Sequence, residues 1–224
     1  MQRELILNFH GIGTPHPAVD PDERGVWMSR GTFAALLDHV AALQAAQAMP
    51  IAITFDDGNA SDADIALPEL SRRNLKAAFF VCAGRLDAPQ YLSRAAVGEL
   101  LDAGMQVGSH GMHHRDWRSL DDAALDEEVG TARRQLEEAC GRPVTTVAIP
   151  FGAYNRRVLA RVRAEGFACA YTSDRGYARC TAWLKPRNTL RLDSVEDDIS
   201  RWLTRSAAVE SALRDVYGLY RRLR

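Results

Sequence analysis

The stretch IAITFDDG, residues 51–58, is a short apolar run that ends in two adjacent aspartates and a glycine. β-Branched and aromatic residues in such a run are typical of a buried strand. Asp56 and Asp57 would repel each other if both were ionised in a dry site. A bound cation removes this conflict if one aspartate binds it and the other stays free as a base. An Asp-Asp-Gly sequence is also a good turn, so this stretch alone leaves a purely structural reading equally open.

The same order of a short apolar run and a longer helical pattern repeats about six times. Ser29 and Ser93 are candidate helix caps, and glycines close several of the helices. Alternation of this kind predicts an α/β fold with a parallel sheet, either open or closed as a barrel. Strands are expected at 4–9, 51–55, 77–82, 105–109, 145–149 and 167–172. Helices are expected at about 30–47, 64–73, 94–104, 121–140, 155–166, 195–203 and 206–224.

Unusual polar residues follow the predicted strands. The residues in question are His10, the aspartates 56 and 57, the histidines 110 and 114, the segment 150–152 and Asp174. The carboxyl ends of parallel strands share one rim of the fold, and that rim holds the active site. Five scattered segments are therefore expected to meet at one place.

Composition restricts the class of protein. The 224 residues fit one domain, taken here as 1–224, and 46% hydrophobic residues are enough for a packed core. A formal net charge of -1 gives no overall attraction to nucleic acid or to a membrane surface. The four cysteines form no CxxC pair and are expected to be free thiols. No membrane span or signal peptide is visible, so a cytoplasmic location is expected.

The segment HGMHH, residues 110–114, holds three of the six histidines. On a helical turn, His110 and His114 would share one face, and His113 would point elsewhere. Together with Asp57 they would supply three protein ligands and leave a position for water, which is the pattern of a catalytic metal site. Zinc fits this ligand set best, and cobalt, nickel or iron could occupy it.

TFDDG at the end of a strand, followed about fifty residues later by SHGMHH and then by PFG, resembles the polysaccharide deacetylase family. This is the NodB-homology group, carbohydrate esterase family 4, and the resemblance spans roughly residues 4–192. It implies a distorted (β/α) barrel of about seven strands, with Asp56 as the catalytic base. It also implies that Asp57, His110 and His114 bind one divalent metal ion, and that the chain removes N-acetyl groups from a carbohydrate and releases acetate.

The sequence departs from the family pattern at three places. Gly111 stands where the family usually has a Ser or Thr that braces the loop. Ala148 stands where an Arg usually orients the base; Arg187 is the candidate replacement, and a surface arginine is an equally open reading. The C-terminal histidine that usually supplies the acid is missing, since no histidine follows His114.

His10, in LNFHGIG, resembles the (F/Y)H opening of one branch of the family. It is a candidate for the acid, with a substrate contact or a supporting role as the alternative. The backbone N–H of Phe151, beside Gly152, is the candidate donor to an oxyanion.

Four aromatic residues are candidates to stack on a sugar ring, with core packing as the alternative. Trp117 and Tyr154 are the best of them because each follows a motif directly, and Trp27 and Trp183 come after them.

Two other functions stay open. The chain could hydrolyse a small non-sugar amide or a cyclic imide with the same metal chemistry, or it could be a non-catalytic carbohydrate-binding module. An open groove with aromatic walls favours a sugar, and a closed pocket favours the small amide. The retained aspartates and histidines argue against the non-catalytic module, and nothing in the sequence indicates an oligomeric state.

Overall fold

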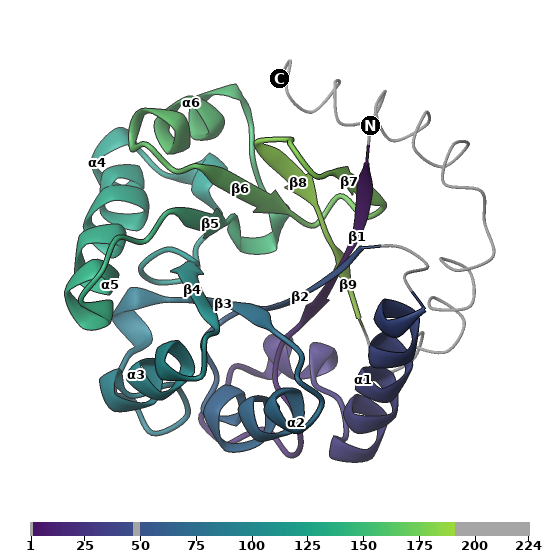
Figure 1. Cartoon of the computed structure of the whole chain (residues 1–224). Helices are drawn as coiled ribbons and strands as arrows, with labels where there is room; N and C mark the ends of the chain where they lie inside the picture. Colours follow the sequence, from purple (N-terminus) through teal and green to yellow (C-terminus); the bar gives the residue numbers. More distant parts are fainter. Residues whose placement is uncertain (1, 47–49, 191–224) are drawn as a thin grey trace.

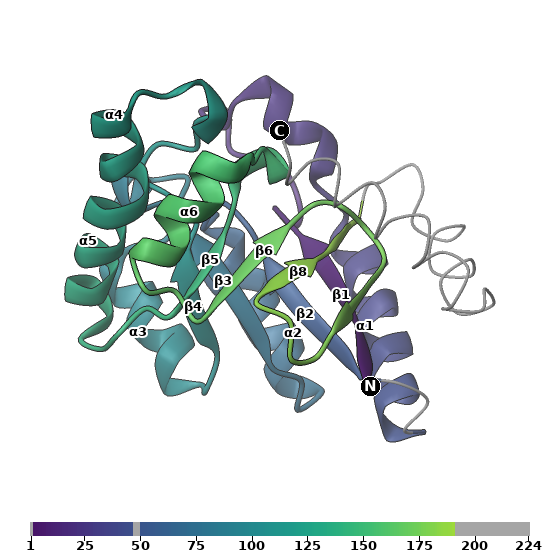
Figure 2. The same ribbon diagram turned by 90° about the horizontal axis from the view of Figure 1, so that it is seen from above.

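A ring of strands surrounded by helices makes up the computed structural model, which describes residues 2–46 and 50–190. Figure 1 views the ring of strands along its axis, from the amino ends of the strands, and Figure 2 shows the strands from the side. The helices expected at 195–203 and 206–224 lie outside the described residues.

Six parallel strands lie side by side in the order of the sequence, as the strand–helix alternation predicts. Each pairs with the next one along the chain. They are β1 (Arg3–Phe9), β2 (Ile51–Phe55), β3 (Ala77–Val81), β4 (Gln106–Ser109), β5 (Thr146–Ala148) and β6 (Cys169–Thr172).

Three short strands after β6 nearly close the sheet. β7 (Tyr177–Arg179) pairs antiparallel with β1. β8 (Leu184–Pro186) pairs with β6, and β9 (Asn188–Thr189) pairs with the opposite edge, β1. The segment 184–189 therefore joins the two ends of the sheet, and the expected distorted barrel is confirmed.

Helices cover the outside of the ring (Figure 1). Ser29 and Ser93 accept hydrogen bonds from the backbone N–H of Thr32 and Ala96, which confirms both caps. Two helical segments contain a π turn, and such turns are frequent near functional sites. The α-helices are α1 (Arg30–Ala45), α2 (Leu67–Arg72), α3 (Arg94–Asp102), α4 (Asp122–Asp126), α5 (Ala132–Cys140) and α6 (Arg156–Ala164). The π turns are η2 (Asp62–Ala66) and η5 (Glu127–Thr131), and the short 3-10 turns are η1 (Pro21–Val26), η3 (Ala83–Arg85), η4 (Trp117–Ser119) and η6 (Pro150–Gly152).

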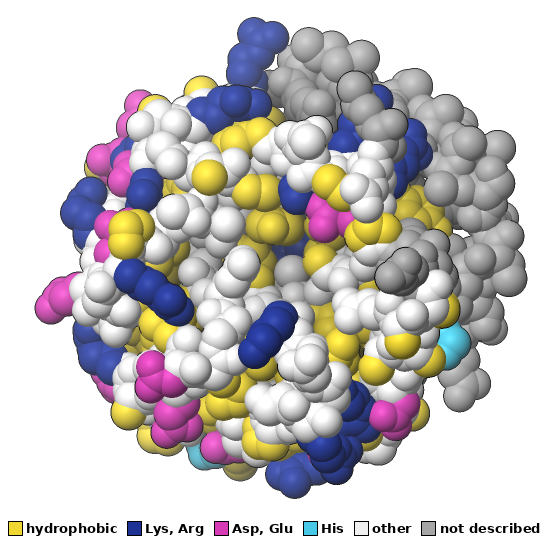
Figure 3. Space-filling view, in the orientation of Figure 1, with side chains coloured by type: hydrophobic (Ala, Val, Ile, Leu, Met, Phe, Trp, Pro, Cys, Tyr) yellow, Lys and Arg dark blue, Asp and Glu magenta, His cyan; other side chains and the backbone are white. Residues whose placement is uncertain are grey.

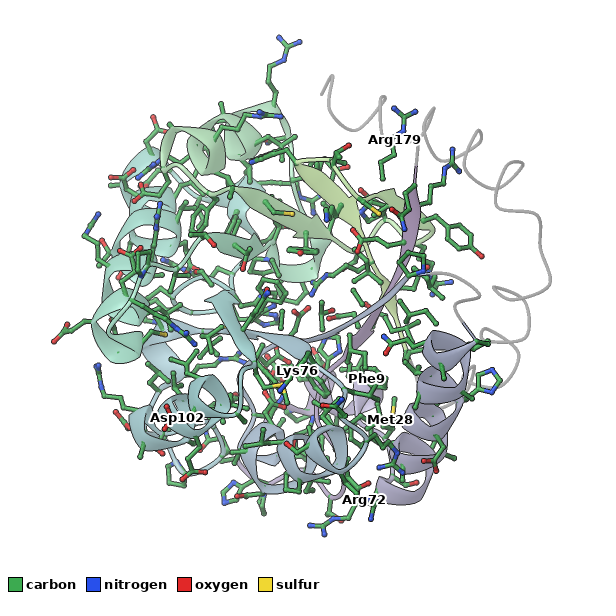
Figure 4. All side chains as sticks on the ribbon, viewed as in Figure 1. Phe9, Met28, Arg72, Lys76, Asp102 and Arg179 are labelled. Carbon is green, nitrogen blue, oxygen red and sulfur yellow. The ribbon has the colours of Figure 1, made fainter. Side chains whose placement is uncertain are left out.

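The two faces of the sheet differ in polarity because successive side chains of a strand point in opposite directions. Phe9, Phe55 and Phe79 occupy paired positions on β1, β2 and β3, and neighbouring rings in this row lie 5.3 and 4.6 Å apart. Phe33 of α1 packs edge-on against Phe9, so this row forms the core between the barrel and α1. Figure 4 shows Phe9 and Met28 in this layer.

The face of the molecule shown in Figure 3 carries Lys and Arg as well as Asp and Glu side chains, with hydrophobic side chains between them. Among the described residues, none of the helices combines the length and the hydropathy that crossing a membrane would require.

Asn188 provides a test of the barrel closure. Its buried amide donates to the carbonyls of Ile6 and Gly176 and accepts from the Gly176 N–H. Asn188→Ala leaves these buried groups without partners, so we expect the free energy of unfolding in urea to fall by about 2–4 kcal/mol. Ser71→Ala, at an exposed position of α2, should change it by less than about 0.5 kcal/mol. Equal effects of the two variants would contradict this account.

Candidate functional site

Asp57, His110 and His114 meet around one point at the carboxyl ends of the strands. Their candidate ligand atoms all lie within 4.8 Å of one another. Asp57 Oδ1 lies 3.6 Å from His110 Nε2 and 3.4 Å from His114 Nε2. This oxygen is buried and accepts no hydrogen bond from the described residues. The strand ends after β2 and β4 thus bring together the three residues that the sequence singles out.

The spacing of these atoms suits one metal ion. Ligand bonds of roughly 2.0–2.2 Å in a tetrahedral arrangement separate neighbouring ligand atoms by roughly 3.3–3.6 Å. Asp57 also has a left-handed backbone, with φ 77°, which is costly for a residue other than glycine. An orphaned buried oxygen on a strained residue beside two imidazoles fits a cation better than a structural turn.

His110 has the tautomer that a metal ligand needs. Its Nδ1 lies 2.8 Å from the carbonyl oxygen of Ala148, which can only accept, so Nδ1 carries the proton and Nε2 faces Asp57. Burial lowers the pKa of His110 to about 4, and the nearby Asp56 opposes this effect only in part. The ring is therefore neutral at pH 7, with the lone pair of Nε2 directed at the site.

The expectation that His110 and His114 share a helical turn is wrong. The chain is a loop here, in which Gly111 and His114 have φ of 84° and 56°. The two rings nevertheless lie 5.1 Å apart, and His113 points away with an exposed side chain, as expected. Burial lowers the pKa of His114, but the hydrogen bond to Glu23 and the negative charges of Asp57 and Glu23 together outweigh burial, so the net direction is upward.

Asp56 lies beside this set and is bound by other partners. Arg187 donates to both of its oxygens at 2.7 Å, and the side-chain amide of Asn8 donates to Oδ2 at 2.9 Å. Burial would raise the pKa of Asp56, but the charge of Arg187, followed by those of the nearby histidines, lowers it well below its usual range. Asp56 is thus an ionised carboxylate at the edge of the three-residue set.

Arg187 is fully buried, which excludes the reading as a surface arginine. It lies between β8 and β9, in the segment that closes the barrel. Its guanidinium also contacts the rings of Phe80 and Tyr171, at 5.2 and 5.8 Å from their centroids.

Comparison with known proteins agrees with this geometry. The family model described as polysaccharide deacetylase matches residues 44–170, which is more than half of the chain. The chain belongs to the polysaccharide deacetylase family. The match starts after His10, so membership of the (F/Y)H branch stays a prediction.

Individual relatives of the family are distant in sequence. The protein YxkH of Bacillus subtilis is 22% identical over 182 residues, which cover 77% of this chain and 65% of that protein. A chitooligosaccharide deacetylase of Bradyrhizobium is 31% identical over 123 residues, covering 54% of each chain. The solved structure of IcaB from Ammonifex degensii has a TM-score of 0.77 at 21% identity, covering 92% of this chain and 98% of that one, and shares the fold. The chain thus spans less than two thirds of the length of these curated relatives.

Glu128 braces the histidine loop, residues 110–114. The deacetylase family usually braces this loop with a Ser or Thr at position 111, where this chain has a glycine. Its fully buried carboxylate, on η5, accepts from the backbone N–H of Met112 and His113 and from the side chains of Arg115 and Trp117. A Cβ atom on Gly111 would lie 2.5 Å from Glu128 Oε2. A glycine is therefore required for the carboxylate to approach, and the missing brace is replaced rather than lost.

His10, Phe151 and Gly152 also lie at the carboxyl ends of the strands. His10 directly follows β1, and its Nδ1 is buried without a hydrogen-bond partner among the described residues. Phe151 has φ 57° and is 62% exposed, and the centroid of its ring lies 4.4 Å from that of His114. A Cβ on Gly152, which has φ 61°, would lie 2.7 Å from the Ser173 nitrogen.

The prediction that Trp117 and Tyr154 stack on a sugar ring is wrong. Trp117 is completely buried and donates to Glu128, and Tyr154 is buried with its hydroxyl on Asp174, so neither presents a ring face to a sugar. Trp183 lies just before β8, at the amino end of the barrel, and stacks with Arg163. Trp27 is 7% exposed and lines a cavity on the rim that holds the site.

Sequence reasoning missed four residues of the site: Asn8, Glu23, Glu128 and Asp62. Asn8 stands two residues before His10 on β1, and its inward position follows from the strand period. Asp62 is fully buried, and burial, followed by the charges of Asp57 and Asp56, raises its pKa well above its usual range.

Gly111→Ser tests the brace by restoring the residue type common in this family. The left-handed backbone and the contact with Glu128 leave no room for a side chain, so we expect a loss of stability of at least about 1 kcal/mol and weaker zinc binding. Thermal unfolding and zinc titration measure the two effects. Gly98→Ser, in open space on α3, is the matched control. Zinc binding as in the wild type for Gly111→Ser would contradict the role of the brace.

Proposed function

We propose that this chain is a metal-dependent hydrolase that removes N-acetyl groups from an N-acetylated sugar and releases acetate. The observation that carries the proposal is the arrangement of Asp57, His110 and His114 around one point, with an ionised Asp56 beside them. Membership of the polysaccharide deacetylase family supports a sugar amide as the substrate.

The three converging residues would hold one divalent ion. Zinc suits two imidazoles and a carboxylate best, and cobalt, nickel or iron suit the same ligands. When bound, the ion would polarise the acetamide carbonyl and lower the pKa of a bound water.

Asp56 acts as the general base and takes a proton from the attacking water. Arg187 and Asn8 hold both of its oxygens, so the carboxylate has one fixed orientation. Because Arg187 keeps Asp56 ionised, the base is ready at neutral pH.

Phe151 and His10 complete the reaction in this proposal. The backbone N–H of Phe151, in the tight turn that Gly152 permits, donates to the developing oxyanion. The exposed ring of Phe151 offers the substrate an apolar face next to His114. His10 donates a proton to the departing amine, and the products are acetate and a free amino sugar.

A cavity of about 640 Å³ on the same rim supports a sugar substrate over a small imide. This volume lies within the range of about 300–1,000 Å³ common for ligand sites. The cavity is lined by segments that follow β1, β2 and β3 and that include Ile12, Trp27, Ser61 and Gln90. Its lining combines Trp27 with several polar side chains, a combination that suits a sugar residue.

Acetate release from a panel of N-acetylated mono- and oligosaccharides, with and without a chelator, tests the function. We expect release that stops with chelator and returns with zinc. Asp57→Ala and His110→Ala should each lose bound metal and at least about 10²-fold in turnover. Full metal content and full turnover in either variant would refute the scheme.

Hydrolysis of cyclic imides but of no sugar would favour the small-amide alternative, and metal-independent sugar binding without acetate release would favour the binding module.

Arg187→Met tests how the base is kept ionised. In the wild type, burial raises the pKa of Asp56, and Arg187 together with the nearby histidines more than offsets this effect. Without Arg187 the effect of burial remains, so the pKa rises and the ionised base appears only at higher pH. We expect the acidic limb of kcat/KM against pH to move upward by one pH unit or more, with activity recovering in alkaline buffer. Arg118→Met, at an exposed position, should leave the limb in place. A uniform loss at every pH would rule out this role.

A further inference from the structure

Glu23 reaches the site from a segment that the family model does not match. It lies on η1, in the connection between β1 and α1, whereas the match begins at residue 44. Its Oε1 lies 3.0 Å from Nδ1 of His114, the ring nitrogen that faces away from Asp57. The side chain of Glu23 is only 12% exposed.

Arg85 fixes the Glu23 carboxylate from the other side. Its two terminal nitrogens lie 2.7 and 3.2 Å from the two oxygens of Glu23. Arg85 ends η3, directly after β3, and Ala83 of the same turn donates to the carbonyl of Gly111 in the histidine loop. Glu23, Arg85 and the histidine loop are therefore connected through short, directional contacts.

The η1 segment itself is well anchored. The side chain of Asp20 caps it, and Arg24 donates to the backbone carbonyl of Val19. Met28 and Gly13 then tie the chain to the end of β1 through backbone hydrogen bonds. The segment thus presents Glu23 from a fixed position.

The two metal-facing histidines need different support. The ring of His110 is held by the carbonyl of Ala148, on the neighbouring strand β5. His114 lies on an irregular loop with a left-handed backbone, and its Nδ1 faces only the carboxylate of Glu23 among the contacts described above. A carboxylate that accepts from one imidazole nitrogen fixes the ring and strengthens the other nitrogen as a metal ligand.

We propose that Glu23 is a positioning residue for the metal site, which orients His114 for ligation through Nε2, and that Arg85 holds Glu23 in place. The inference rests on the proposed metal site and adds a residue outside the matched family region. It makes the β1–α1 segment a part of the metal centre.

The test compares zinc affinity, measured by competition with a chromophoric chelator, for Glu23→Ala, Glu23→Gln and the wild type. We expect Glu23→Ala to bind zinc roughly 10–100-fold more weakly, and Glu23→Gln to show a smaller loss because the amide oxygen can still accept from Nδ1. Asp22→Asn removes a neighbouring exposed carboxylate of the same turn and should bind zinc like the wild type. The absorption spectrum of the cobalt-loaded protein should change in Glu23→Ala and stay unchanged in Asp22→Asn.

Arg85→Met should weaken zinc binding in the same direction, and its effect should largely disappear in the Glu23→Ala background. Zinc affinity and a cobalt spectrum like those of the wild type in Glu23→Ala would overturn the proposal. If Glu23→Ala does not fold, Glu23→Gln decides: an unchanged affinity overturns the proposal and a loss supports it. A wild-type protein that binds no metal would refute the metal site itself, whereas failure of the Glu23 variants alone leaves the proposed function intact.

Discussion

The ion pair of Asp56 and Arg187 inside the barrel is the interaction on which the rest of the site depends. Neither charge could be buried alone, because an unpaired ion in a protein interior costs several kcal/mol. The pair joins the end of β2 to the segment that closes the barrel, so closure of the sheet and ionisation of the base depend on one contact. Asn8, from β1 between them, accepts from Arg187 and donates to Asp56.

The sequence alone predicts the regular part of the fold because that part follows from local physics. Apolar runs of four to six residues and helical periods with caps at Ser29 and Ser93 locate the six parallel strands and the described helices. β7, β8 and β9 were not predicted, since each has only two or three residues and exists through pairing with β1 or β6. Such strands carry no periodic signal of their own.

In the candidate site too, the features that follow from local sequence could be predicted, and those that depend on distant residues could not. The convergence of Asp57, His110 and His114 follows from their places after parallel strands, and the candidate Arg187 does lie on Asp56. The conformation of the histidine loop could not be predicted, because it depends on Glu128, which lies fourteen residues after His114 on a π turn. The burial of Trp117 has the same origin, since its indole is a further donor to that carboxylate. Deviations from a family pattern, such as Gly111, are thus informative only when the compensating residue is known.

The segment 184–189, which joins the two ends of the sheet, also affects the order in which this chain folds. Asp56 and Arg187 are 131 residues apart, so a ribosome must synthesise almost the whole barrel before the two can meet. Until then Asp56 is an ordinary hydrated acid, and β1 has an open edge where β9 will bind. Contacts between such distant parts of a chain slow folding. Completion of the barrel is therefore a late event, and the catalytic base matures in the same step that seals the sheet.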